Sequence, residues 1–131
     1  MPKFPVKADA ASAAFLEGAA RGEFLIVKDT QTGEFHEPQF PVAQDPERYR
    51  YVPAAGTGTV VSWSVVHEKN AEGGVDRRPV GIVQLDEGPW FWAELVGADP
   101  DADLMDLPVT VDFQKFDDGS AVPFFRPQHG A

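Results

Sequence analysis

The densest group of potential metal ligands lies in the acidic segment 99–103, which reads Asp-Pro-Asp-Ala-Asp. Carboxylates at alternate positions are typical of the start of a calcium-binding loop, which supplies oxygen ligands at that spacing. Such a loop also needs glycine at its sixth position and a bidentate acid at its twelfth. The chain has Leu104 and Thr110 there, so we expect a solvated acidic loop rather than a calcium site.

Two histidine–glutamate pairs, His36-Glu37 and His67-Glu68, are the other candidates for metal binding or acid–base chemistry. Neighbouring residues of a strand face opposite ways, and the two pairs have no recognised ligand spacing. His67 falls at the end of a predicted strand, which leaves open a rim histidine or a proton shuttle. The sequence also lacks a G-x-S-x-G elbow and the glycine motifs that cradle phosphates. We therefore assign no catalytic residue.

The composition excludes several further classes of chemistry. The chain has no cysteine, which rules out disulfides, thiol catalysis and thiolate zinc sites. Its net charge of −10 argues against binding a nucleic-acid backbone or an anionic membrane surface. A solvated acidic surface and a partner with a basic face both remain compatible with that charge.

The length of 131 residues predicts one compact unit with its own core. The first residues, Met-Pro-Lys-Phe-Pro-Val, lack the apolar run of a signal peptide, and no apolar stretch is long enough to span a membrane. These features predict a cytoplasmic protein.

The N-terminal third must supply a helix and a short sheet. After an irregular arm, helical spacing of small apolar residues predicts a helix that ends near Gly22, capped by Asp9 or Ser12, with Phe15 and Leu16 as anchors. A short apolar strand follows at 24–28, and Gly33 marks a turn. From 37 to 53 the repeated prolines predict loops and extended pieces.

The remainder of the chain alternates apolar and polar residues, as a curled antiparallel sheet requires. Val61, Trp63 and Val65 share one face of its first strand, and further strands follow at 79–85, 90–96, 109–116 and 121–126. We predict a mainly β fold with a five-stranded barrel. The expected division is an arm and helix at 1–22, a small segment at 23–55, the barrel at 56–127 and a flexible tail at 128–131.

The segment Trp90-Phe91-Trp92 is the strongest candidate for a contact surface. Alternation sends Phe91 to one side of its strand and both tryptophans to the other. If Phe91, Ala93 and Leu95 fill the barrel, the two indoles lie outside, near the strand of Trp63. The alternative is that the helix or the N-terminal arm covers them.

Six segments taken in order resemble a known family: FLEGAARGEF, FLIVKDTQTGEF, YVPAAGTGTVVSWSVVH, RPVGIVQLDEGPWFWAELVG, LPVTVDF and VPFFRP. The chain is similar over residues 13–127 to the acyl-CoA-associated OB-fold family, the DUF35 family of zinc-ribbon plus OB-fold proteins. The resemblance implies that the predicted barrel is an OB-fold. Its most specific parts are 52–60 and 83–89.

The chain departs from the family at the zinc ribbon, which the family holds through two cysteine pairs. Asp29 and Thr32 stand where the first pair would be, and the second pair would lie around 42–45, where there is no cysteine. Oxygen ligands from Asp29 or Asp45 do not rebuild a thiolate site. We therefore expect a metal-free ribbon-like segment, with no zinc cofactor, in which Phe35, Phe40 and Tyr51 pack together.

The resemblance implies a non-catalytic accessory subunit of a thiolase-like or lipid-transfer-protein-type enzyme, in a hetero-oligomer. The partner would make or break carbon–carbon bonds in acyl-CoA or related thioesters, as a thiolase, an acyltransferase or a retro-aldolase. The expected partner or ligand contacts are Phe15, Leu16, Phe40, Tyr51, Trp63, Trp90 and Trp92. Arg77 and Arg78 could contact the phosphates of CoA, or form only a solvated turn.

Two alternatives come from other classes of function. The first is a stand-alone barrel that binds acyl-CoA or another small ligand in its own cavity. The second is single-stranded nucleic-acid binding, which OB-folds perform with aromatic side chains on a basic groove. The excess of 21 acidic over 11 basic residues disfavours the second.

Overall fold

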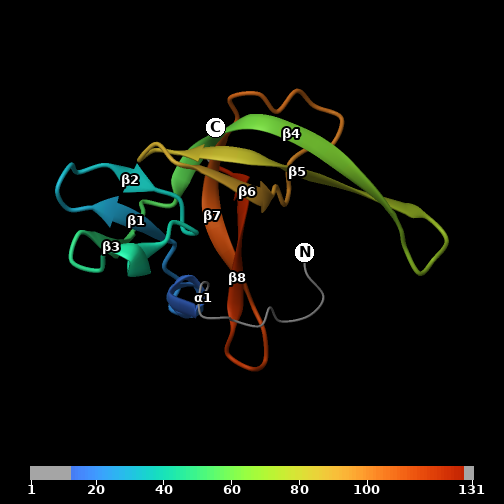
Figure 1. Cartoon of the computed structure of the whole chain (residues 1–131). Coiled ribbons are helices and arrows are strands. Elements are labelled where there is room, and N and C mark those ends of the chain that lie inside the picture. The colour runs from blue at the N-terminus through green and yellow to red at the C-terminus, as the bar shows by residue number, and fades with distance from the viewer. Residues whose placement is uncertain (1–12, 129–131) are drawn as a thin grey trace.

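The computed structural model describes residues 13–128 and contains one small sheet, one large sheet and a helix (Figure 1). The arm at 1–8, the predicted caps Asp9 and Ser12, and the end of the tail at 129–131 lie outside the described residues. Helix α1 spans Ala13–Ala20, and its buried residues are the small Gly18 and Ala19. A Cβ on Gly18 would lie only 2.7 Å from the Leu25 side chain, so this position needs glycine.

The small sheet has the order β2-β1-β3, and all its neighbouring strands are antiparallel. Its strands are β1 (Leu25–Asp29), β2 (Phe35–His36) and β3 (Tyr49–Pro53). A short 3-10 helix, η1 (Val42–Gln44), lies in the connection before β3. Sequence reasoning expected only loops and extended pieces here. Strand β3 forms because the only proline in it is the last residue, Pro53, so the preceding positions keep the amide hydrogens that a ladder needs.

The large sheet has the order β6-β5-β4-β7-β8. Its strands are β4 (Thr57–Lys69), β5 (Val75–Leu85), β6 (Trp90–Glu94), β7 (Pro108–Lys115) and β8 (Ala121–Pro127). Just after β6, Leu95 forms a parallel bridge with Phe125, and the Val96 amide donates to the Phe125 carbonyl at 2.9 Å. This contact brings the two outer strands together. The five strands therefore form the nearly closed OB-type barrel that the sequence predicted.

A bulge in β4 turns two side chains that lie three residues apart, Val60 and Trp63, toward the same interior. The register against β5 shifts between Val60 and Ser62, and Val60 is fully buried while Trp63 also packs against the core. Simple alternation would send these two side chains to opposite faces, and the extra residue reconciles them. Next to the bulge, where Gly81 pairs with Trp63, a Cβ on Gly81 would lie only 2.3 Å from the Ser62 carbonyl oxygen. Glycine is therefore required where the two backbones approach.

The core lies where the barrel, β1 and α1 meet. The Phe24 ring contacts the rings of Phe15, Phe91 and Phe125, with centroid distances of 5.4, 4.8 and 5.8 Å. Phe24 and Phe125 are essentially inaccessible to solvent. The helix is thus fixed to the barrel by aromatic packing.

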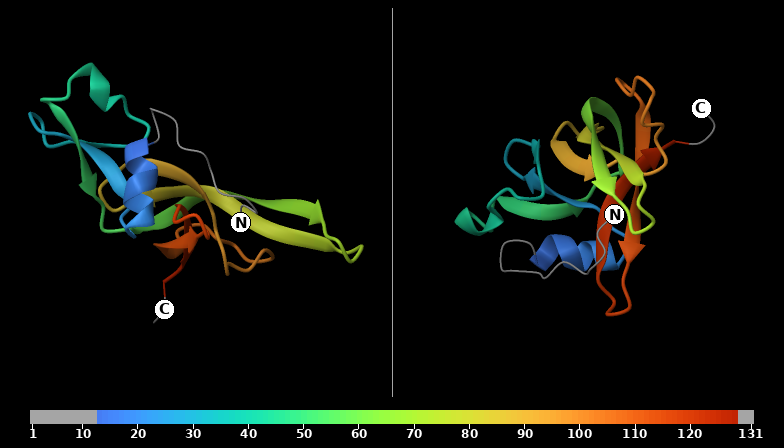
Figure 2. Two further views of the ribbon diagram at one scale, coloured as in Figure 1. Left: turned by 90° about the horizontal axis from the view of Figure 1, so that it is seen from below. Right: turned by 90° about the vertical axis from the view of Figure 1, so that its right-hand side faces the viewer.

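The molecule is elongated because its two appendages extend in opposite directions. The small sheet lies beyond one end of the barrel, and the outer half of the β4–β5 hairpin projects from the other (Figures 1 and 2). No helix among residues 13–128 is long and apolar enough to cross a membrane.

Candidate functional site

Four of the residues considered for chemistry, the three aspartates of 99–103 and His36, form structural contacts, and His67 lies on the surface. Asp99 and Asp103 each accept a hydrogen bond from the backbone two residues later, and Asp101 pairs with Arg77. His36 stacks on Phe40 with 4.0 Å between ring centroids, and His67 is an exposed residue of β4. Within the described part of the chain, no three histidine or acidic side chains are grouped as metal ligands.

The pKa shifts of Asp101, Asp118 and Arg77 do not favour acid–base roles for these three groups. Hydrogen bonds from Arg77 and from Ser120 lower the pKa values of Asp101 and Asp118, respectively. A hydrogen bond to Asp101 raises the pKa of Arg77. Each shift stabilises the charged form, whereas a general acid or base needs a pKa near the working pH.

The most prominent exposed apolar surface is the outer face of β6. Trp90 is 59% exposed and Trp92 is 61% exposed, while the next residue, Ala93, points to the other side of β6 and is buried. The cross-strand neighbours of the two tryptophans on β5 are Gln84 and Ile82, respectively. We call Trp90, Trp92, Ile82 and Gln84 the tryptophan face. Helix α1 does not cover it, because Phe15 packs against Phe91, which points to the opposite side of β6.

The other predicted contact residues do not join this face. Trp63 lies opposite Gly81, whose neighbour on β6 is the buried Ala93, so Trp63 faces the interior while the tryptophan face points outward. Phe15 belongs to the aromatic core, and Leu16 beside it is half-buried. Strand β5 lies between β6, which carries Trp90 and Trp92, and β4, which carries Trp63.

The remaining predicted contacts lie on the small sheet. The Phe40 ring is stacked on His36 and lies 4.7 Å from the ring of Tyr49. Tyr51 is half-buried and pairs with Val27 of β1. The ribbon aromatics were expected to be Phe35, Phe40 and Tyr51. Instead, Phe40 packs with His36 and Tyr49, and Phe35 packs against the main core.

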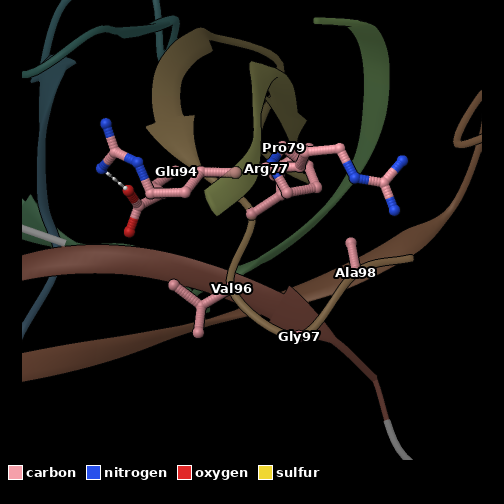
Figure 3. A pocket seen from close by; sticks show the side chains of 8 residues that line it. Arg77, Pro79, Glu94, Val96, Gly97 and Ala98 are labelled. Atoms are coloured by element: carbon pink, nitrogen blue, oxygen red, sulfur yellow. Dashed lines mark hydrogen bonds and ion pairs between the residues drawn. The ribbon is translucent and has the colours of Figure 1, made fainter. Parts of the chain in front are cut away.

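Arg77 and Arg78 line a hollow of about 240 Å³ beside the barrel opening. Figure 3 shows Val96, Gly97 and Ala98 across this hollow from Pro79 and Glu94, with the ion pair of Glu94 drawn as a dashed line. Arg77 holds both oxygens of Asp101, and Arg78 pairs with Glu94 at 2.5 Å and with Glu68 at 3.1 Å. Both cations already have carboxylate partners, so a phosphate would have to displace them.

A second hollow, of about 310 Å³, lies on the small sheet and was not anticipated from the sequence. Lys28, Thr30, Arg50 and Val52 line it. The two basic residues are cross-strand neighbours on β1 and β3. No local sequence signal brings them together, because their pairing depends on the register of strands separated by a long connection.

The position expected for zinc in the family is occupied by a polar cluster around Asp29. Its Oδ1 accepts hydrogen bonds from the amides of Gln31 and Thr32, and Arg48 donates to both carboxylate oxygens at 2.8–3.1 Å. Asp29 is 2% exposed. The Arg48 hydrogen bonds hold the pKa of Asp29 well below its usual range, although burial opposes this shift.

These residues do not fit a zinc site. Both oxygens of Asp29 are engaged, Thr32 offers a hydroxyl in place of a thiolate, and the chain has no cysteine. Arg48 also accepts hydrogen bonds at its carbonyl oxygen from the Thr30 amide and hydroxyl. The Asp29–Arg48 pair, which we call the polar clamp, thus joins the β1–β2 turn to the segment before β3.

Comparison with known proteins places this geometry in a family. Residues 51–114 match the family described as the C-terminal OB-fold domain of ChsH2. The solved structure of an "Ltp2-ChsH2(DUF35) aldolase" is similar over 97% of this chain and 98% of that chain, with a TM-score of 0.74 and 27% identity.

Two curated relatives are longer proteins. The 3-oxo-4,17-pregnadiene-20-carboxyl-CoA hydratase alpha subunit of Mycobacterium tuberculosis is 32% identical over 110 residues, or 83% of this chain. A probable enoyl-CoA hydratase alpha subunit of Thermomonospora curvata is 37% identical over 76 residues, or 58% of this chain. The chain spans only 35% and 24% of their lengths. Together with the barrel topology, these matches show that the chain belongs to the DUF35 family of OB-fold proteins, in a form without the zinc-binding cysteines.

Proposed function

We propose that this chain is a non-catalytic accessory subunit of an enzyme that acts on acyl-CoA or related acyl thioesters. The observation that carries this proposal is the similarity over nearly the whole chain to the structure of an aldolase named after two components, Ltp2 and ChsH2(DUF35). The two curated relatives are also named as subunits of enzymes that act on CoA thioesters. The aldolase name contains a DUF35 component, and this chain matches part of each hydratase alpha subunit.

The finer part of the proposal concerns the partner and its reaction. We propose a thiolase-like or lipid-transfer-protein-type partner that forms or cleaves a carbon–carbon bond by thiolysis, acyl transfer or retro-aldol reaction. The DUF35 subunit would stabilise the complex and help to shape the channel for the substrate. The catalytic groups would belong to the partner, and the carboxylates of Asp29, Asp101 and Glu94 in this chain are held by arginines.

The tryptophan face is the proposed docking surface for this partner. Two indoles, each about three-fifths exposed, offer a large rigid apolar area, and tryptophan is enriched at the energetic centres of interfaces. The other predicted contacts lie elsewhere: Phe40 and Tyr51 on the small sheet, and Phe15, Leu16 and Trp63 at or near the core. A role for them in binding would require a second contact region.

A stand-alone barrel that encloses an acyl chain agrees less well with the interior. Phe24, Leu85, Leu95 and Phe125 each have at most 2% of their surface exposed, and aromatic rings fill the centre. An acyl chain inside the barrel would have to displace these packed side chains.

We also propose that the segment 23–55 and the barrel 56–127 act as two parts of one folded unit. The small sheet would present its outer face to ligands, and the barrel would present the tryptophan face to the partner. Residues Phe24 and Ile26 connect the two parts, because both belong to the main core cluster.

The test of the accessory role is capture of the tagged chain from a lysate of its native host, followed by mass spectrometry. We expect a thiolase-like or other acyl-CoA enzyme in stoichiometric amount. The same capture with Trp90→Ser/Trp92→Ser should lose that enzyme, whereas Val75→Thr, an exposed apolar position on the far hairpin, should retain it. Recovery of the unaccompanied chain as a monomer would contradict the proposal.

A further inference from the structure

Arg50 differs from the other arginines of this acidic chain. Acidic residues outnumber basic ones by 21 to 11, so each arginine has many potential partners. Five of the six form ion pairs with carboxylates: Arg21, Arg48, Arg77, Arg78 and Arg126. Arg50 forms no ion pair with any residue in the range 13–128.

Lys28 lies directly beside Arg50. The two residues are register partners on the antiparallel strands β1 and β3, so their side chains leave the same face of the small sheet. The Lys28 ammonium lies 5.8 Å from the centre of the Phe35 ring, a cation–π contact that leaves its hydrogen-bond donors free. Like charges opposite each other in a sheet are destabilising. An anion bound between Lys28 and Arg50 would therefore reduce the repulsion between their charges.

The hollow between these residues can hold only a small group. Its volume of about 310 Å³ lies at the lower end of the range for small-molecule sites. This size suits a phosphate together with part of the sugar that carries it. It is too small to enclose an intact CoA. The side chain of Val52 gives the hollow one apolar wall, and Thr30 lies at its other end.

The charge of the site favours phosphate. An arginine guanidinium and a lysine ammonium are the side chains that proteins use most to bind phosphate oxygens. The negative charge of the remaining chain is screened over about 8 Å at physiological ionic strength, so the adjacent cations dominate inside the hollow. By contrast, Asp101, Glu94 and Glu68 neutralise the arginines of the other hollow.

We propose that the cleft between Lys28 and Arg50 binds a phosphate group, and that in the complex this is a phosphate at the nucleotide end of acyl-CoA. The identity of the ligand rests on the proposed function, whereas the anion site rests only on the geometry of the small sheet. The site lies at the end of the molecule away from the β4–β5 hairpin (Figures 1 and 2). Because carboxylates already hold Arg77 and Arg78, the cleft between Lys28 and Arg50 replaces them as our preferred phosphate contact.

The test is calorimetric titration of the purified full chain with CoA, dephospho-CoA, 3′-phosphoadenosine 5′-phosphate and inorganic phosphate. We expect CoA and the bisphosphate to bind. Lys28→Gln/Arg50→Gln should weaken binding roughly tenfold to a hundredfold, the usual effect of losing hydrogen bonds to a charged group. Weaker binding of dephospho-CoA would assign the site to the 3′-phosphate, and equal binding would assign it to the diphosphate.

The matched control is Arg77→Gln/Arg78→Gln, which removes the same number of charges from the other hollow and should leave CoA binding unchanged. Amide shifts of Lys28 and Arg50 in the NMR spectrum on addition of phosphate provide a second readout that also reports folding. Absence of CoA and bisphosphate binding, or equal binding by the Lys28/Arg50 variant, would overturn the proposal. If phosphate binds at Lys28 and Arg50 but no enzyme is captured, only the accessory function fails. If an enzyme is captured but CoA, the bisphosphate and inorganic phosphate all fail to bind, only the anion site fails.

Discussion

The barrel and the small sheet are stabilised in different ways. The barrel encloses a continuous apolar core in which Phe24, Phe91 and Phe125 contact one another. The outer part of the small sheet depends instead on the polar clamp and on the half-buried His36–Phe40–Tyr49 cluster. A family segment that lacks its metal ligands can therefore keep its fold if directed polar contacts join the same turns. Its stability should depend on pH and substitution differently from that of the barrel.

The largest effect is expected at the centre of the barrel. Phe125→Ala would remove a fully buried ring and leave a cavity, at a cost of about 3–5 kcal/mol in the free energy of unfolding. This is a large share of the roughly 5–15 kcal/mol that stabilises a typical domain. Urea unfolding should show one cooperative loss of both sheets, because Phe24 and Ile26 belong to the same core. Phe124→Ala, at the half-buried neighbour, should cost clearly less; equal costs would contradict the assignment of Phe125 to the core.

The outer face of the barrel should contribute to binding rather than to folding. Trp90→Ser/Trp92→Ser is expected to weaken partner affinity by about 2 kcal/mol or more, roughly thirtyfold, as for other interface centres. The free energy of unfolding should change by only about 0.5 kcal/mol per site, because both side chains are exposed. Surface plasmon resonance with the captured enzyme and urea unfolding measure the two effects. A variant that loses stability while keeping its affinity would reverse this interpretation.

The next largest loss of stability is expected where the backbones of β4 and β5 approach each other, beside the bulge. Gly81→Ala places a Cβ 2.3 Å from the Ser62 carbonyl oxygen, so the strands must separate locally. Crowding of this kind typically costs about 1–3 kcal/mol. Gly74→Ala is the matched control, because its new Cβ would meet only the side chain of Asn70, at 3.2 Å. Urea unfolding of both variants should rank Gly81→Ala as the more damaging, and the opposite order would show that the bulge tolerates a side chain.

Acidification is expected to change the free energy of unfolding least, and its effect should be confined to the small sheet. The folded-state pKa of Asp29 is lowered, so its contribution is complete above the ordinary carboxyl value near 4 and decreases as the pH falls toward the folded-state value. Hydrogen exchange should show the amides of Thr30 and Gly33 losing protection below about pH 4 while Val83 in the barrel stays protected. Asp29→Asn should reproduce this loss at neutral pH. Simultaneous loss of protection in both sheets would contradict a separate role for the clamp.

Much of the barrel could be predicted from the sequence because its signals are local. Alternation in Trp90-Phe91-Trp92 is sufficient to place Phe91 inside and the tryptophans outside, as the structure has them. The bulge that turns both Val60 and Trp63 inward could not be predicted, because a single extra residue leaves no distinct pattern.

The candidate sites of the small sheet were less predictable. The contact between Asp29 and Arg48 joins residues nineteen positions apart, and the pair of Lys28 and Arg50 depends on strand register. Arg77 and Arg78 were identified from their charge alone, and only the structure shows that carboxylates hold them. Sequence patterns predict which way a side chain points more readily than which distant residue it meets.

The central claim is that this chain supports an acyl-CoA enzyme without supplying its catalytic groups. The most direct measurement is turnover of an acyl-CoA substrate by the purified captured enzyme, with and without stoichiometric amounts of this chain. We predict no turnover by this chain alone, low turnover by the partner alone and full turnover only when both are present. Turnover by this chain alone, or by the partner at an unchanged rate without it, would contradict the claim.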